Sequence, residues 1–250
     1  MDGTLTLDIH QQIATLTFGH PAANSLRPEM LSDLCDLIRE ADTDPQVKVL
    51  IIQSEGERAF CAGASLEALK KVTTEEQGTE FFMGFARLMN SIRNCSKFVI
   101  ARVQGKVVGG GIGLVAACDY AIARDTASIR LSELSIGIGP YVIEPAVSRK
   151  MGKTAFNQLS LDSANWRSAE WAYSKGLYAG CCASLEQLDQ EVKSLTERLA
   201  GYDLSALQKL NELHWNDTEH WDELLPKKAK ITGQLALSEH CQNILHQKHG

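Results

Sequence analysis

The residues of this 250-residue chain whose types and spacing could do chemistry gather in two short glycine-containing turns. One turn reads Ala62-Gly63-Ala64-Ser65, and the other reads Gly109-Gly110-Gly111-Ile112-Gly113. Small residues let a backbone approach a ligand closely and leave its N–H groups uncovered. Two such turns could direct two N–H donors at one carbonyl oxygen, which is the requirement for stabilising an oxyanion. From the spacing alone, close packing of a helix against a strand is the competing interpretation.

Two glutamates downstream are candidates for acid–base chemistry. Glu133 ends a strand-like run that begins at Ser128, and the apolar segment 134–140 follows it. A carboxylate placed in this way can be desolvated, which raises its pKa and suits it to act as a general base. A capping or salt-bridged glutamate is the alternative. Glu144 precedes Pro145, and the first turn of a helix is a favourable place for its negative charge even without a catalytic role.

Several other kinds of site lack their sequence patterns. The second turn is neither a GxxxxGK[ST] phosphate loop nor a GxGxxG dinucleotide motif, because Leu114 occupies the last position of the latter. His214 and His220 are six residues apart, and no HExxH or Cys/His ligand spacing occurs. A GxSxG nucleophile elbow is also absent from the sequence. We therefore expect no metal site, no nucleotide fold and no serine-hydrolase triad.

Alternating strands and helices must position the two turns. Buried strands are predicted over 47–54 and 98–103, shortly before the turns, and the second turn opens a short helix over 110–117. The other predicted elements are a hairpin (4–9 and 13–18), a helix over 28–41, a helix opened by a capping box at Thr74 to Gln77, and a strand over 119–123. Beyond Gly152 the pattern is almost purely helical, with Ser168 as an N-cap and Gly176 as a C′ glycine. This order predicts an α/β domain with largely parallel strands and a boundary near residue 185.

Composition narrows the class of protein. The chain is 44% hydrophobic and 22% charged, as in ordinary globular proteins, and its formal net charge of −6 argues against nucleic-acid or membrane-surface binding. Seven cysteines without a CxxC pair are typical of reduced thiols. The N-terminal residues lack the pattern of a secretory signal, and charged and polar residues interrupt the apolar stretch 99–123. We expect a soluble, cytoplasmic protein.

Several ordered motifs resemble the crotonase, or enoyl-CoA hydratase/isomerase, superfamily over essentially the whole chain. They are Asn24-Ser25-Leu26, Asp44-Pro45-Gln46-Val47, Phe60 to Leu66, Gly105 to Gly111, Cys118-Asp119 and Ser132-Glu133. The resemblance implies an α/β fold, a crotonase-like spiral of ββα repeats over residues 1–185, followed by a C-terminal helical trimerisation region over 186–250. It also implies a homotrimer, or a hexamer made of two trimers.

The resemblance also implies a coenzyme A thioester as the substrate, with no permanently bound cofactor. Carried over by position, Ala64 and Gly110 supply the two N–H groups for the thioester oxygen, and Ser65 replaces the usual aspartate with another good N-cap. The expected CoA-binding residues are Arg58, Ala62, Ala64, Lys70 and Lys227, with Lys71 beside them. For the exposed lysines a solvated surface is the alternative. Phe81, Phe82, Met83 and Phe85 would form an acyl-binding wall unless they are core residues.

One departure from the family pattern concerns the reaction. Hydratases of this superfamily use two glutamates, and here the first of these positions is Gly113 while Glu133 is retained. Addition of water needs two acid–base groups, whereas moving a double bond from C3 to C2 needs one base. Isomerisation is therefore slightly favoured. Hydration with Glu144 or a non-protein group as partner, thioester hydrolysis or decarboxylation, and acyl-CoA binding without turnover remain alternatives.

Overall fold

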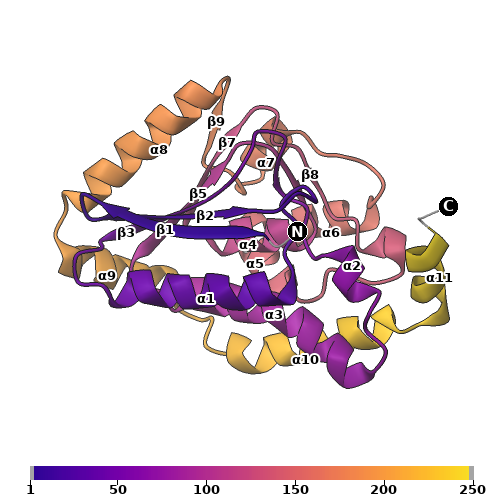
Figure 1. Ribbon diagram of the computed structural model, residues 1–250. Helices are drawn as coiled ribbons and strands as arrows, with labels where there is room; N and C mark the ends of the chain where they lie inside the picture. Colours follow the sequence, from indigo (N-terminus) through magenta and orange to yellow (C-terminus); the bar gives the residue numbers. More distant parts are fainter. Residues whose placement is uncertain (1–2, 248–250) are drawn as a thin grey trace.

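Two β-sheets form the centre of the protein, whose computed structural model describes residues 3–247 (Figure 1). The larger sheet has the strand order β1-β2-β3-β5-β7-β9, and the smaller has the order β4-β6-β8. Only the β1–β2 pair is antiparallel among the pairs that the described strands form. The strands are β1 (Thr4–His10), β2 (Ile13–Gly19), β3 (Val49–Ser54), β4 (Ala59–Cys61), β5 (Phe98–Val103), β6 (Lys106–Val108), β7 (Tyr120–Arg124), β8 (Ile129–Arg130) and β9 (Gly180–Cys182).

The chain runs between the two sheets in three successive ββα turns. Each turn places one strand in the large sheet, the next strand in the small sheet, and then a helix: β3-β4-α3, β5-β6-α4 and β7-β8-α5. The helices are α3 (Glu75–Arg93), α4 (Gly110–Ala117) and α5 (Glu144–Met151), with the short α2 (Leu66–Leu69) and the 3-10 turn η1 (Leu134–Ile136) inserted before α3 and α5. The predicted spiral of ββα repeats is thereby confirmed.

Helices cover both faces of the large sheet. The alternation of side chains along β3 directs Leu50 and Ile52 into the main core, toward α1 (Pro28–Thr43) and α3. Ile51 points the other way and packs with Leu188 of α8 (Leu185–Ala200). In Figure 1, α1 and α3 accordingly lie below the strands and α8 above them. The parallel central strands are therefore buried on both faces, as parallel sheets generally are.

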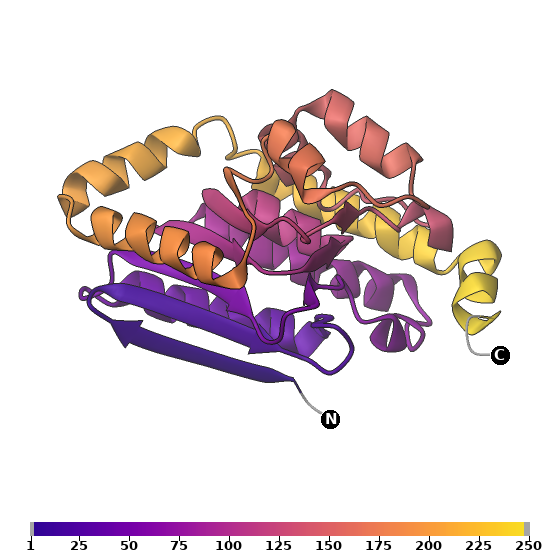
Figure 2. The same ribbon diagram turned by 90° about the horizontal axis from the view of Figure 1, so that it is seen from above.

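The C-terminal helices pack against the spiral. They are α9 (Leu204–His214), α10 (Trp221–Ala236) and α11 (Glu239–Gln247), preceded by α6 (Lys153–Leu161) and α7 (Ala169–Ser174). Helices α3 and α10 cross in backbone contact at Gly78 and Gly233. A Cβ built on Gly233 would lie 2.5 Å from the carbonyl carbon of Gly78, so only glycine fits at this crossing. Figure 2 shows α10 running beside the spiral toward the C-terminus. The predicted boundary at residue 185 coincides with the start of α8, and the division into two domains stays a prediction.

Local signals in the sequence account for several element ends. Thr74 caps α3 as predicted, with its hydroxyl accepting from the N–H of Gln77, but the Gln77 side chain accepts from Thr73 rather than completing the predicted box. Ser168 caps α7, and Gly176 follows that helix with a φ of +84°. Beyond Gly152 the described structure is almost purely helical, as predicted, and the short strand β9 is the exception. Its three residues are too few to show an alternation. Within residues 3–247, no helix combines the length and apolar character needed to cross a lipid bilayer.

Candidate active site

The carboxyl ends of the three strands of the small sheet meet at one edge, and each delivers one of the predicted catalytic groups. β4 leads into Ala62 to Ala64, β6 leads into Gly109-Gly110, and β8 is followed by Glu133 three residues after its end. Because all three strands are parallel, their carboxyl ends lie side by side. The structure therefore brings together Ala64, Gly110 and Glu133 in one cavity.

The first turn is held by the segment that precedes α1. The N–H of Leu26 donates to the carbonyl of Gly63 (2.8 Å), and the N–H of Ser65 donates to the carbonyl of Leu26 (3.0 Å). The Ser65 hydroxyl then caps α2 by accepting from the N–H of Ala68 at 3.3 Å, so the serine performs the capping expected of it. Ala64 lies between the two fixed residues, and its N–H donates to no other described residue.

The second turn lies directly against the first. Gly109 has a φ of +54°, which favours glycine, and its N–H donates to the carbonyl of Arg130 at 3.0 Å. A Cβ on Gly63 would lie 3.2 Å from the nitrogen of Gly110, so the two turns are in backbone contact. The N–H of Gly110, like that of Ala64, has no hydrogen-bond partner among residues 3–247. Two uncommitted N–H groups thus line one cavity, as an oxyanion hole requires.

The Glu133 carboxyl group is buried beside these turns. A Cβ on Gly109 would lie 2.9 Å from Oε1 of Glu133, and Oε2 has no partner among the described residues. Burial raises the pKa of Glu133 to about 7, although the backbone N–H groups of Glu133 and Ser132 partly oppose this shift. The alternative role as a helix cap is not observed, since the side chain makes no capping bond to η1. Glu133 thus has the properties of a general base near neutral pH.

The whole cavity has a volume of about 310 Å³, and away from the two turns and Glu133 its lining is mostly apolar. Its apolar lining includes Leu66, Leu69, Phe82, Phe85, Ile138 and Ile143. Phe82 and Phe85 line the cavity and are also buried in the main core, so both predicted interpretations apply to them. Phe81 is buried in the same core and Met83 packs against it, and neither is in the described lining of the cavity. The ionisable residues of the described lining are Glu133, Arg130 and Tyr141.

Gly113 and Ile143 are matched in shape. A Cβ on Gly113 would overlap Cγ2 of Ile143 and would lie 2.7 Å from its Cβ, so the isoleucine fills the space that a side chain at position 113 would need. Ile143 also lines the cavity. An apolar side chain therefore occupies the region beside the position where the family resemblance places a hydratase's first glutamate.

Glu144 is engaged away from this cavity. Its carboxylate accepts from Nζ of Lys228 on α10 at 2.8 Å and from the Ser148 hydroxyl at 2.9 Å. Burial alone would raise the pKa of Glu144, but the bonds from Lys228 and Ser148 outweigh it, and the pKa is lowered. Glu144 begins α5 and does not line the site among the described residues. Its arrangement is that of an ion-paired carboxylate in the first turn of a helix.

The predicted CoA-binding residues are only partly gathered at the cavity. Ala62 and Ala64 line it, whereas the side chains of Arg58, Lys70 and Lys227 lie outside its described lining. Lys70 is 15% exposed and pairs with Glu67 at 3.2 Å, and Lys227, 72% exposed, lies 3.8 Å from Glu223. Arg58 lines a separate surface hollow together with Lys106.

Arg130 is a site residue that the sequence predictions missed. The only signal was a basic residue between Ile129 and Leu131, in a run whose odd positions are apolar, three residues before Glu133. The structure places its backbone next to Gly109 at the edge of the cavity, and its guanidinium carbon 4.8 Å from the ring centre of Trp166.

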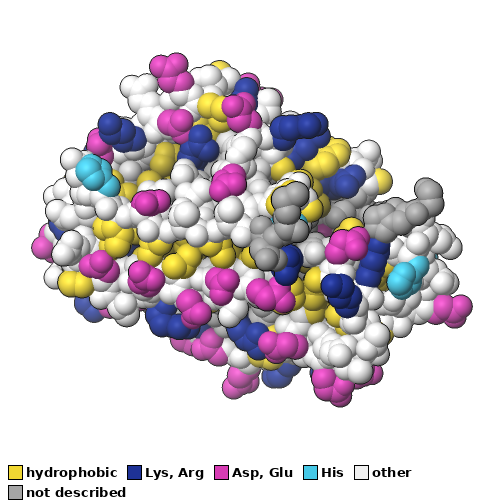
Figure 3. Space-filling model, viewed as in Figure 1, with side chains coloured by type: hydrophobic (Ala, Val, Ile, Leu, Met, Phe, Trp, Pro, Cys, Tyr) yellow, Lys and Arg dark blue, Asp and Glu magenta, His cyan; other side chains and the backbone are white. Residues whose placement is uncertain are grey.

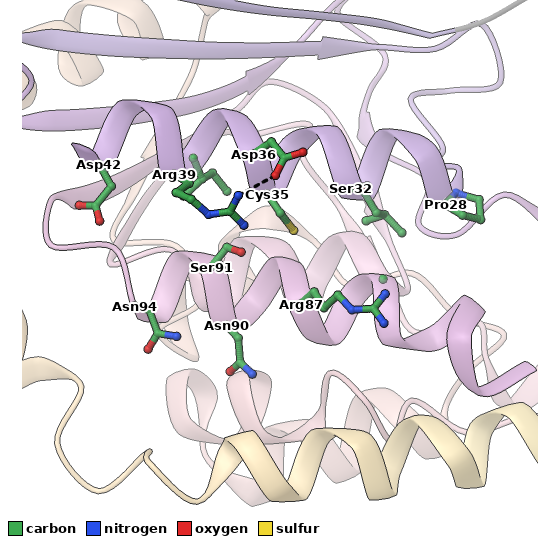
Figure 4. A pocket seen from close by; sticks show the side chains of 13 residues that line it. Pro28, Ser32, Cys35, Asp36, Arg39, Asp42, Arg87, Asn90, Ser91 and Asn94 are labelled. Atoms are coloured by element: carbon green, nitrogen blue, oxygen red, sulfur yellow. Dashed lines mark hydrogen bonds and ion pairs between the residues drawn. The ribbon is translucent and has the colours of Figure 1, made fainter. Parts of the chain in front are cut away.

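A second hollow, of about 450 Å³, lies between α1 and α3 but has no comparable chemistry (Figure 4). Both of its arginines are paired, Arg39 with Asp36 at 2.9 Å and Arg87 with Glu80 at 2.5 Å. The remaining charged residue of its lining, Asp42, accepts hydrogen bonds from the backbone N–H and the hydroxyl of Ser96. Burial raises the pKa of its Cys35 thiol, which leaves this group protonated. Among residues 3–247 no cluster of three or more His, Cys, Asp or Glu could hold a metal ion. On the face seen in Figure 3, acidic and basic side chains are interspersed.

The chain is similar in sequence and in structure to known proteins. The chain is 30% identical over 197 residues to the crotonyl-CoA hydratase of Syntrophomonas wolfei, covering 78% of this chain and 75% of that protein. It is 25% identical to the carnitinyl-CoA dehydratase of Escherichia coli strain K12, covering 96% and 97%. The crystal structure of an enoyl-CoA hydratase from Mycobacterium avium superposes with a TM-score of 0.87 at 26% identity, covering 98% of this chain and 96% of that one. One from Bacillus halodurans gives 0.91 at 20% identity, covering 97% and 99%, and supports the fold. The family model for enoyl-CoA hydratase/isomerase matches residues 8–249, and the chain belongs to this family of acyl-CoA enzymes.

Proposed function

We propose that the protein isomerises 3-enoyl-CoA thioesters to 2-enoyl-CoA thioesters. The observation that carries the proposal is a single buried carboxyl group, that of Glu133, next to two uncommitted N–H groups in an apolar cavity. The thioester oxygen accepts hydrogen bonds from the N–H groups of Ala64 and Gly110. Ionised Glu133 removes a proton from C2, and the negative charge passes to the thioester oxygen as a dienolate. The same proton, returned at C4, moves the double bond from C3 to C2.

Substrate binding in this proposal divides between the cavity and the surface. The acyl group occupies the apolar part lined by Phe82 and Phe85, and the backbone around Ala62 and Ala64 meets the CoA arm. Arg58, Lys70 and Lys227 remain proposed contacts for the CoA phosphates. Lys70 would exchange its partner Glu67 for a phosphate, since it is ion-paired without ligand. No permanently bound cofactor is proposed. The assembly is proposed to be a homotrimer or a dimer of trimers, which sedimentation analysis tests.

The test of the proposed reaction is turnover of 3-hexenoyl-CoA, followed by the conjugated 2-enoyl product. We expect the purified protein to form this product and the Glu133→Gln variant to lose about 100-fold or more of kcat/KM. Glu144→Gln serves as the control, because Glu144 is paired with Lys228 outside the cavity. Retention of full activity by Glu133→Gln would exclude the proposed role of the carboxylate.

Hydration of a 2-enoyl-CoA is the second candidate, because relatives bear the names crotonyl-CoA hydratase and carnitinyl-CoA dehydratase. It would require a second acid–base group, and Glu144 could serve only after leaving Lys228 and Ser148. Formation of 3-hydroxyacyl-CoA from crotonyl-CoA, abolished by Glu144→Gln, would establish this alternative. Calorimetric binding of acyl-CoA without turnover of any thioester would instead indicate a binding protein.

A further inference from the structure

The turn η1, which begins directly after Glu133, is held by backbone hydrogen bonds. The carbonyl of Glu133 accepts from the N–H groups of Ile136 and Ile138, both at 3.1 Å. The N–H of Gly137 donates to the carbonyl of Leu134, also at 3.1 Å, and Gly137 ends the turn with a φ of +82°. Because Oε2 of Glu133 has no hydrogen-bond partner among the described residues, the place of the carboxyl group depends on this turn.

The last helix, α11, lies directly against η1. A Cβ built on Gly137 would lie 2.9 Å from Cδ2 of His240 and 3.2 Å from Cα of Cys241. The second of these atoms belongs to the backbone, which cannot rotate away as an imidazole ring can. Glycine at position 137 therefore lets η1 and α11 approach each other more closely than a residue with a side chain would.

Helix α11 has its own anchors to the rest of the protein. Cys241 and Leu245, one helical turn apart, are 0% and 1% exposed. The hydroxyl of Ser238 accepts from the N–H of Cys241 at 3.2 Å, and the side chain of Gln242 donates to the carbonyl of Ala236 at 2.7 Å. In Figure 1, α11 accordingly follows the end of α10 at the edge of the molecule. These contacts make α11 a support on which η1 can rest.

The segment 136–138 contacts both the reaction cavity and α11. Ile136 and Ile138 are buried and belong to the lining of the cavity, whereas Gly137 between them meets α11. A displacement of α11 would therefore reach the backbone of η1 at Gly137, and from there Glu133. Burial is the main cause of the raised pKa of Glu133, so a loosened turn that admits water would lower this pKa.

We propose that α11 positions Glu133 for proton transfer by supporting η1 at Gly137. This inference rests on the proposed function for the reaction that Glu133 performs. Gly137 and Cys241 are positioning residues in this proposal, because they act on the substrate only through Glu133. Binding of the CoA thioester uses the N–H groups of Ala64 and Gly110, so it should depend little on the contact with α11.

The first test places asparagine at position 137. Asparagine tolerates a positive φ, and its side chain would need space that α11 occupies. Gly137→Asn should lower kcat/KM for 3-hexenoyl-CoA at least about tenfold, while the calorimetric Kd for saturated hexanoyl-CoA changes by no more than about threefold. Gly56→Asn is the matched control, because its φ is +73° and a Cβ there would meet no atom of the described residues within 4 Å beyond its chain neighbours.

A second pair of variants loosens α11 without touching η1. Leu245→Ala removes a buried anchor that lies outside the described lining of the cavity, and it should lower kcat/KM in the same way as Gly137→Asn. His246→Ala, at an exposed position of the same helix, should change kcat/KM by no more than about twofold. Thermal unfolding of each variant verifies that it is folded.

The titration of Glu133 provides a measurement that needs no turnover. In 13C NMR of protein labelled at the glutamate carboxyl carbons, the Glu133 signal is assigned by its absence in Glu133→Gln, and its midpoint in the wild type should lie near pH 7. Gly137→Asn and Leu245→Ala should lower this midpoint by about one pH unit or more, because water reaches the carboxyl group. The two control variants should keep the wild-type midpoint.

The outcomes separate this inference from the proposed function. Midpoints that stay near pH 7 in folded Gly137→Asn and Leu245→Ala would overturn the support by α11 and leave isomerisation untouched. Equal losses of kcat/KM and of hexanoyl-CoA affinity would also overturn it, because α11 would then shape the binding cavity instead of placing Glu133. If the wild type isomerises no 3-enoyl-CoA, the proposed reaction is wrong, and lowered midpoints in the two variants would still establish that α11 positions Glu133.

Discussion

At the scale of single residues, Glu133 has the environment that a lone general base needs. Its carboxyl group is buried without an ion-pair partner among residues 3–247, and burial raises its pKa to about 7. A base of this pKa is substantially ionised at neutral pH and still accepts a proton readily. Glu144 has the opposite environment, because the hydrogen bonds to Lys228 and Ser148 keep it ionised.

This difference predicts the pH dependence of the reaction. Because Glu133 must be ionised to remove the C2 proton, kcat/KM for isomerisation should rise with pH, bend near pH 7 and then stay level. Below the bend, kcat/KM should fall about tenfold for each unit by which the pH is lowered. Steady-state rates between pH 5 and pH 9 provide the measurement. A bell-shaped profile centred near neutrality would instead reveal a second essential acid.

The contact between Gly113 and Ile143 leads to a prediction about stability. Gly113→Ala should lower the free energy of unfolding by about 1–3 kcal/mol, because its Cβ would overlap a buried side chain. In a protein that already carries Ile143→Ala, Gly113→Ala should lower the free energy of unfolding by much less. The effects of the two substitutions should therefore depart from additivity by at least about 1 kcal/mol. Urea unfolding of the four proteins measures this coupling. Additive effects would mean that the two side chains do not compete for one space.

At the scale of elements, the contact of α3 with α10 connects the C-terminal helices to the site. Thr232 of α10 and Phe82 of α3 both line the cavity, and the two helices touch at Gly78 and Gly233. The spacing of these helices therefore contributes to the width of the acyl site.

We predict that Gly233→Ala forces the two helices apart. Its Cβ would meet the backbone of Gly78 and Thr79 at 2.5 Å, and backbone cannot move aside as a flexible side chain can. The free energy of unfolding should fall by about 1–3 kcal/mol, and KM for the enoyl-CoA substrate should rise. Gly201→Ala is the control: at the C-cap of α8 its φ is −77°, and its Cβ would lie 3.4 Å from the carbonyl oxygen of Arg198, an ordinary contact. Gly201→Ala should change the free energy of unfolding by no more than about 0.5 kcal/mol. Equal effects of the two substitutions would argue against a tight crossing.

Sequence patterns predicted the long elements, but of the three short strands that build the site they indicated only the run that contains β8. The runs at 47–54 and 98–103 are apolar enough to indicate buried strands, and β3 and β5 lie there with shifts of at most two residues. β4, β6 and β8 have three, three and two residues, too few for a periodicity to appear. The glycine turns raised the possibility of two N–H groups facing one oxygen, and the family resemblance then assigned Ala64 and Gly110 to it. Arg130 was missed because its place beside the second turn depends on the pairing of β6 with β8, which no local pattern reveals.

At the scale of the whole molecule, the requirements of the site and of stability oppose each other at Glu133. A carboxyl group whose folded pKa is raised above its ordinary value of 4.5 favours its protonated form in the folded protein. As pH rises, the unfolded chain ionises first, so folding stability falls between about pH 4.5 and pH 7 and the deficit then remains constant. A desolvated base therefore destabilises the protein under the conditions in which it works.

Replacing this carboxyl group by an uncharged amide should accordingly stabilise the protein above pH 7. At pH 8 we expect Glu133→Gln to exceed the wild type by about 1–3 kcal/mol in the free energy of unfolding, and at pH 4.5 we expect the difference to vanish. At pH 8 Glu144→Gln should instead be less stable than the wild type. The lowered pKa of Glu144 contributes stability that is lost only as pH falls, and the substitution removes it. Urea unfolding of the three proteins at both pH values measures these differences. If Glu133→Gln were less stable than the wild type at pH 8, the carboxylate would be held by favourable partners and would not be a desolvated base.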